Sequence, residues 1–238
     1  MKNITASLLC PVLSLFLFLN ANAQETVTRK KKVGNWFEEQ YQVLKSQKSV
    51  KHGLYEAKNH ERLLASGNYE NGQPVGEWKF YNLKGDLVQI YDHTKRSLTF
   101  SDTTDAKFDG YSFGQDINPG DVVVPPVKMG GKAYTIFPLM SGARPALTHL
   151  YRANGMGNGN YDLLHLFNID AQGNLTSHQI VYTLNGHLLS VKADDKDLPQ
   201  DYTHFIPATI NGKAVASTVS VKGKVTTNAA INNVGYGY

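Results

Sequence analysis

The sequence has one cysteine, Cys10, which lies in an apolar stretch near its start. That stretch has the pattern of a removable export signal, so the processed chain is expected to hold no thiol and no disulfide. This absence excludes thiol catalysis, zinc–thiolate sites and iron–sulfur clusters. We expect no metal and no cofactor.

Neither sign of charge is in large excess, since 24 Lys and Arg stand against 20 Asp and Glu, a net charge of +4. That balance is too mild to require nucleic acid or an acidic membrane as a partner. After the first residues, no apolar run reaches the about 20 residues that a membrane helix needs. We therefore expect no nucleic-acid partner and no integral membrane span in the processed chain.

Residues 1–23 have the three parts of a signal peptide. Lys2 supplies the positive start, residues 8–19 form the apolar core, and Ala21-Asn22-Ala23 is a small-x-small cleavage pattern. We predict cleavage between Ala23 and Gln24 and an exported bacterial protein. The periplasm is the expected compartment, with secretion or association with the outer membrane as the alternatives.

Residues 24–100 have the pattern of a repeated antiparallel β-meander. Gly53, Gly67 and Gly76 are each followed two residues later by an aromatic residue, and turn signals such as Asn71-Gly72-Gln73-Pro74 separate short runs rich in aromatic residues. This spacing suits short strands whose alternate residues face one side of a sheet.

The same segment resembles the MORN-variant repeats of bacterial proteins over about residues 51–92. The matching residues are Gly53-x-Tyr55, Gly67-Asn68-Tyr69-Glu70-Asn71-Gly72, Gly76-x-Trp78-x-Phe80-Tyr81 and Gly85-x-Leu87. The resemblance implies a β-ribbon used for binding or spacing, and it implies no reaction.

The aromatic residues of this ribbon have two interpretations. In the first they pack in the core and across strands, because a thin sheet has few core positions and large rings must supply the buried surface. In the second, Tyr55, Tyr69, Trp78 and Tyr81 form one exposed row that stacks on a glycan, as in a lectin-like surface protein. Trp78 and Tyr69 are therefore candidate binding residues.

The rest of the chain is expected to form a linker, a second domain and a tail. Residues 101–121 are rich in Asp, Gly, Thr and Ser, which predicts the linker. Residues 122–225 predict a short helix at 132–140, a hairpin turning at 170–173, a helix at 188–198 and a hairpin around Asn211-Gly212. Residues 226–238 are the tail. The predicted fold class is α+β, an antiparallel β-meander followed by a small α/β sandwich of sheet and helices.

The second domain resembles the C-terminal domain of TonB-family proteins over residues 122–225. The matching residues are Pro126 with Gly130-Gly131, then Pro145, Phe167-x-Ile169-Asp170-x-x-Gly173, the run from Phe205 through Asn211-Gly212-Lys213-x-Val215, and Val219 with Val221. The resemblance implies a small sheet backed by helices, whose exposed strand pairs with a peptide from a membrane receptor by β-strand addition.

The position carried over from that family is the last strand, residues 215–225. Its candidate binding residues are Val215, Ser217, Val219 and Val221. The nine prolines of the chain are not clustered into the long spacer of an energy-transducing TonB protein. We therefore expect the binding fold without force transmission.

Two patterns suggest chemistry. Gly110-Tyr111-Ser112-Phe113-Gly114 matches the Gly-x-Ser-x-Gly elbow of serine hydrolases, but no buried strand precedes it and no helix follows, so we interpret it as a glycine-rich loop. His165 and His178 lie on the two strands of the predicted hairpin. A turn that pairs Asp170 with Asn174 would put the two rings on opposite faces, which disfavours a metal site.

The sequence therefore predicts an exported, non-catalytic binding protein of the bacterial envelope. The expected partner is an envelope or outer-membrane protein, bound through an exposed edge strand. The alternatives are a secreted serine hydrolase that uses Ser112 and a lectin-like protein that binds a glycan on the aromatic face.

Overall fold

The computed structural model describes residues 24–33, 37–102, 108–142, 147–148, 159–184, 187–193, 200–228 and 233–237. The predicted signal peptide, residues 1–23, lies outside this part of the chain, as do Pro145 and residues 194–198 of the predicted helix. The structure is mostly antiparallel β-sheet with short helical segments. No helix within the described ranges is long and apolar enough to cross a membrane.

The first half is a seven-stranded antiparallel meander in chain order, which confirms the β-meander predicted for residues 24–100. Its strands are β1 (Thr26–Val33), β2 (Phe37–Leu44), β3 (Lys51–Asn59), β4 (Arg62–Glu70), β5 (Gln73–Tyr81), β6 (Leu87–Asp92) and β7 (Ser97–Ser101). The β4–β5 turn has positive φ at Asn71 and Gly72, which matches the preference of two-residue hairpin loops for Asn-Gly.

One glycine of the repeats explains the aromatic pattern. Gly67 in β4 lies against the ring of Trp78 in β5, and a Cβ at Gly67 would collide with that ring. The Trp78 Nε1–H donates to the Asn68 carbonyl at 3.2 Å, and the ring centroid lies 5.0 Å from that of Tyr55. Of the glycines in the Gly-x-aromatic repeat, Gly67 is the one that leaves room for a ring from the next strand, since a Cβ at Gly53 would meet the Gln42 side chain and Gly76 has open space around it.

The second half contains a six-stranded antiparallel sheet in the order β13-β12-β11-β17-β18, with β8 also paired to β17. The strands are β8 (Gly110–Phe113), β11 (Gly159–Ile169), β12 (Leu175–Leu184), β13 (His187–Lys192), β17 (Ser217–Asn228) and β18 (Asn233–Gly237). The predicted hairpin with its turn at 170–173 is the β11–β12 pair. The predicted helix at 188–198 is wrong for its first part, because that segment is β13.

Five short strands form two small sheets in addition to the large one. They are β9 (Val123–Val124), β10 (Val127–Lys128), β14 (Phe205–Ile206), β15 (Ala208–Ile210) and β16 (Lys213–Val215). The Asn211-Gly212 hairpin is the β15–β16 pair, with positive φ at both turn residues. The segment predicted to be a linker, 101–121, also contributes structure, since β8 lies in it and Phe108 is buried in the core.

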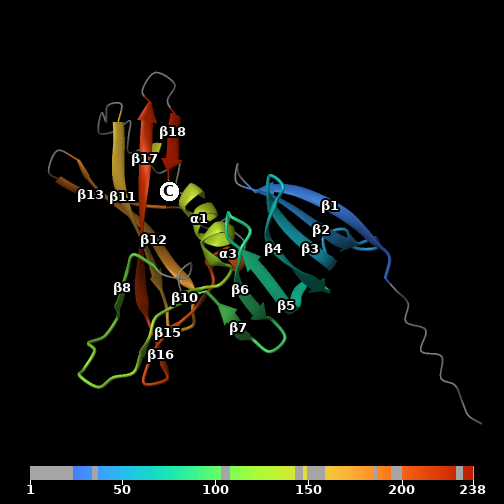
Figure 1. Ribbon diagram of the computed structural model, residues 1–238, viewed down its shortest axis with the longest axis horizontal. Helices are drawn as coiled ribbons and strands as arrows, with labels where there is room; N and C mark the ends of the chain where they lie inside the picture. The colour runs from blue at the N-terminus through green and yellow to red at the C-terminus, as the bar shows by residue number, and fades with distance from the viewer. Residues whose placement is uncertain are drawn as a thin grey trace, which may run out of the picture.

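Short helical segments join the two halves. A π-helical turn η1 (Lys132–Ile136) runs into α1 (Phe137–Gly142), where the sequence predicts a short helix, and α3 (Gln200–Thr203) follows later in the chain. Figure 1 shows α1 and α3 between the meander and the large sheet. Tyr134 and Tyr202 from these segments are buried in the same core cluster as Tyr55 and Trp78 of the meander.

Candidate functional site: a free sheet edge

The strand predicted to be an exposed edge is in the interior of the sheet. On one side β17 pairs with β11, and on the other it pairs with β8 at residues 217–220 and with β18 at residues 224–228. Between these two partners, the amide of Lys222 donates to Asp109 Oδ2 at 2.6 Å. No exposed edge is left on β17 for a partner.

Two features of the chain explain this error. The predicted single strand at 215–225 is broken at Ala216, so that Val215 ends β16 and Ser217 begins β17 in a different sheet. The segment interpreted as a tail then returns as β18 and pairs with residues 224–228 of β17. Its sequence, Asn233-Val234-Gly235-Tyr236-Gly237, alternates Val and Tyr with Asn and Gly, a period-two pattern that could have predicted the strand.

The candidate side chains on this strand are also buried. Val215, Ser217, Val219 and Val221 all belong to the interior, and Val219 is fully enclosed. They pack against other core residues and cannot face a bound peptide. The residues that we predicted to bind a partner are therefore core residues.

The aromatic face of the meander is likewise packed inside. Trp78 is 2% exposed, Tyr69 is 6% exposed, Tyr55 is fully buried, and Tyr81 is only partly exposed. Tyr55, Tyr69 and Trp78 form ring contacts with centroids 5.0 to 5.6 Å apart. The exposed row that a lectin-like protein needs is absent from these residues, and the core interpretation is correct.

Ser112 does not lie on a nucleophile elbow. It is in β8, opposite Thr218 of β17, and its side chain is exposed. A hydrolase elbow requires a tight turn from a strand into a helix, and Ser112 lies within a paired strand. The glycine-rich loop expected here is wrong as well, because the motif is a strand. Nothing in this geometry favours the hydrolase alternative.

The pairing of His165 and His178 differs from the prediction because of a bulge. Asp170 does pair with Asn174, through an amide-to-carbonyl bond of 3.0 Å. Thr176 is then an extra residue in β12 that has no direct partner in β11, and every later pair is shifted by one position. The shift brings the two histidines onto the same face of the sheet, so the opposite-face prediction is wrong.

The two rings meet in the core. His165 Nδ1 lies 2.9 Å from His178 Nε2, and both side chains are fully buried. Burial, and secondarily the neighbouring His178, lower the pKa of His165 to about 3, so that its ring is neutral at neutral pH. No group of three His, Cys, Asp or Glu side chains in the described ranges is placed to hold a metal. We assign the pair a structural role.

The large sheet has an open edge at β13. The amide of Ala193 donates to the His178 carbonyl at 2.9 Å, and the register places these two residues opposite one another. Hydrogen-bonded and non-hydrogen-bonded pairs alternate along an antiparallel ladder. The backbone groups of Leu188, Ser190 and Lys192 therefore point away from β12. No strand in the described part of the chain pairs with them.

The meander also has two edge strands, β1 and β7. Strand β1 differs from β13 in its density of charged residues. It carries Arg29, Lys30, Lys31 and Lys32 in one run, and charged residues of this kind protect an edge from pairing. By contrast, β13 has one lysine, and its Leu188 side chain is 74% exposed. The edge of β13 is the candidate site, and it is a strand that the sequence interpreted as part of a helix.

Comparisons of the chain with protein-family models, with curated proteins and with solved structures give no significant match.

Proposed function

We propose that the protein is an exported, non-catalytic adaptor of the bacterial envelope that binds an extended peptide of a partner protein by strand addition at β13. The observation that carries this proposal is the outward backbone of Leu188, Ser190 and Lys192, which no described strand satisfies. Export is supported by the signal-like pattern of residues 1–23.

The chemistry of such binding is supplied by the backbone. An added antiparallel strand would take up the N–H and C=O groups of the three outward residues, which gives affinity. Its side chains would lie beside those of Leu188 and Lys192 on the outer face of the sheet, where cross-strand pairs interact. A peptide with an apolar residue near Leu188 and an acidic residue near Lys192 is the favoured ligand.

The resemblance to TonB C-terminal domains supports the same mode of binding, with the site on β13 in place of the last strand. The MORN-like meander then acts as a support, because its core is shared with η1 and α3 of the second half. An envelope or outer-membrane protein is the proposed partner, and the periplasm the proposed compartment.

The test uses peptides selected from a random displayed library on the purified protein. Binding of the best peptide is measured by fluorescence anisotropy to the protein and to its Ser190→Pro and Ser190→Ala variants. Proline removes an outward N–H without removing a bond to β12, so Ser190→Pro should abolish binding, whereas Ser190→Ala should keep it.

A second experiment uses the unaltered protein and changes the peptide. Peptides are N-methylated at alternate residues, and one of the two alternating sets should lose binding while the other keeps it. Equal binding of both sets, or full binding to a folded Ser190→Pro variant, would contradict strand addition at β13. Circular dichroism and thermal melting show whether the proline variant is folded.

A further inference from the structure

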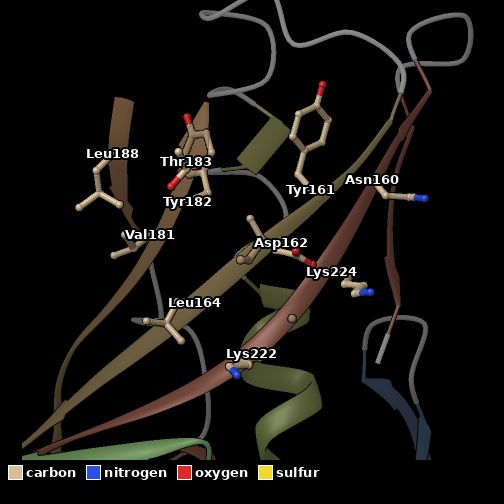
Figure 2. A pocket seen from close by; sticks show the side chains of 12 residues that line it. Asn160, Tyr161, Asp162, Leu164, Val181, Tyr182, Thr183, Leu188, Lys222 and Lys224 are labelled. Atoms are coloured by element: carbon tan, nitrogen blue, oxygen red, sulfur yellow. The ribbon is translucent and has the colours of Figure 1, made fainter. Parts of the chain in front are cut away.

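The outer face of the large sheet contains an open hollow of about 970 Å³. Residues of β11, β12, β13 and β17 line it, and Figure 2 shows their side chains. The register places Leu164 opposite both Val181 and Lys222, and Asp162 opposite Lys224. We call this region the outer hollow and define it by Asp162, Leu164, Val181, Leu188, Lys222 and Lys224.

One part of the outer hollow is apolar. Leu164 and Val181 lie on adjacent strands, are only partly buried and belong to none of the core clusters. Leu188 is the most exposed of the large apolar side chains described. Contiguous apolar surface in a concave site is typical of ligand binding, and the volume is within the range of about 300–1,000 Å³ of small-molecule sites.

The neighbouring part is positively charged. Lys222 and Lys224 are exposed on the same face of β17, two residues apart. Within the described residues neither ammonium group forms an ion pair. Asp162 is the one acidic side chain among the lining residues, so the two lysines leave an excess of positive charge beside the apolar surface.

We propose that the outer hollow binds a single long-chain alkyl carboxylate. The alkyl chain would lie over Leu164, Val181 and Leu188, and the carboxylate would accept hydrogen bonds from Lys222 and Lys224. An apolar surface beside two ammonium groups is complementary to such an amphiphile in both polarity and charge. The concave shape suits one chain, whereas a membrane surface is flat.

The proposal is tested by isothermal titration calorimetry of the full protein with laurate and dodecylammonium below their micelle concentrations and with dodecanol below its solubility limit. Laurate should bind, and the neutral alcohol and the cation should bind at least about tenfold more weakly, because they lack the charge-assisted hydrogen bonds. In the Lys222→Glu/Lys224→Glu variant, the preference should reverse in favour of dodecylammonium. The main-chain bond of Lys222 to Asp109 does not involve its side chain and is retained.

Two further variants extend the test, and the second separates this site from the peptide site, because Leu188 belongs to both sites and Ser190 does not line the outer hollow. Leu188→Ser, at an exposed position that folding should tolerate, should weaken laurate binding. Ser190→Pro should leave laurate binding unchanged, so the failure of strand addition and the failure of this proposal are distinguishable.

Three results would overturn the proposal: no laurate binding, equal affinity for laurate and dodecanol, or unchanged laurate binding in the double lysine variant. Binding to phosphatidylglycerol vesicles without binding to monomeric laurate would assign the outer hollow to a membrane surface and would also overturn it.

Discussion

The hydroxyl of Tyr202, in α3, donates a hydrogen bond of 3.0 Å to Glu39 Oε1, in β2, across 163 positions of the chain. The Tyr55 hydroxyl donates to the same oxygen at 2.9 Å and lies 2.8 Å from the Tyr134 hydroxyl. Burial, together with the neighbouring Tyr134 and Glu39, raises the pKa of Tyr55 and of Tyr202, so both hydroxyls remain protonated donors. This buried cluster connects the meander to the second half.

The first prediction follows from that connection. Tyr202→Phe removes one bond and should lower the free energy of unfolding by about 1 kcal/mol, whereas Glu39→Leu leaves two buried hydroxyls without their acceptor and should cost about 3 kcal/mol. Urea unfolding measures both, with Tyr111→Phe at a half-exposed position as the control.

The two halves should unfold in one transition. Two separate transitions in the unaltered protein would show that the cluster does not couple them.

The second prediction concerns the glycine under Trp78. Gly67→Ala should destabilise the protein by about 3 kcal/mol, since the new methyl group overlaps the indole and the ring stack must move. Gly159→Ala is the matched control, because its Cβ would lie 3.6 Å from the Tyr161 ring, an ordinary contact. Thermal melting and Trp fluorescence follow the change. Similar melting temperatures for the two variants would show that the Gly67–Trp78 contact is not tight in solution.

The third prediction is a pH dependence. Folding lowers the pKa of His165 from 6.5 to about 3, so between these values the unfolded state binds more protons than the folded state. Stability should therefore fall as the pH drops below 6.5, by at most about 1.4 kcal/mol per pH unit from this group. His165→Gln should reduce that slope, and His187→Gln, at an exposed position, should not. Denaturant titrations from about pH 4.5 to 7, which cover the upper part of this window, measure the slope. Equal slopes in all three proteins would mean that His165 is accessible to protons in the folded state.

The sequence predicted the local elements better than their partners. The Asn71-Gly72 and Asn211-Gly212 turns and the 170–173 turn were identified because turn chemistry acts over a few residues. The place of residues 217–228 in the sheet was missed, since it depends on β8 and β18, which are far from each other in the chain.

The candidate site was missed for a related reason. The segment His187–Lys192 lies next to Asp194-Asp195 and Pro199, and the sequence pattern there suggests a poor helix as readily as a strand. Pairing with β12 decides between them. The face on which each histidine lies was also mispredicted. One bulged residue, Thr176, shifts the register and so determines which side chains share a face.

The most direct measurement of the central claim is amide hydrogen exchange along β13, resolved by NMR, without and with a selected peptide. In the free protein, the amides of Leu188, Ser190 and Lys192 should exchange rapidly and those of Leu189 and Val191 slowly, and the peptide should slow the first set. If Ser190 is as protected as Val191 in the free protein, or if the bound peptide leaves its exchange unchanged, β13 is not the edge at which a partner strand adds.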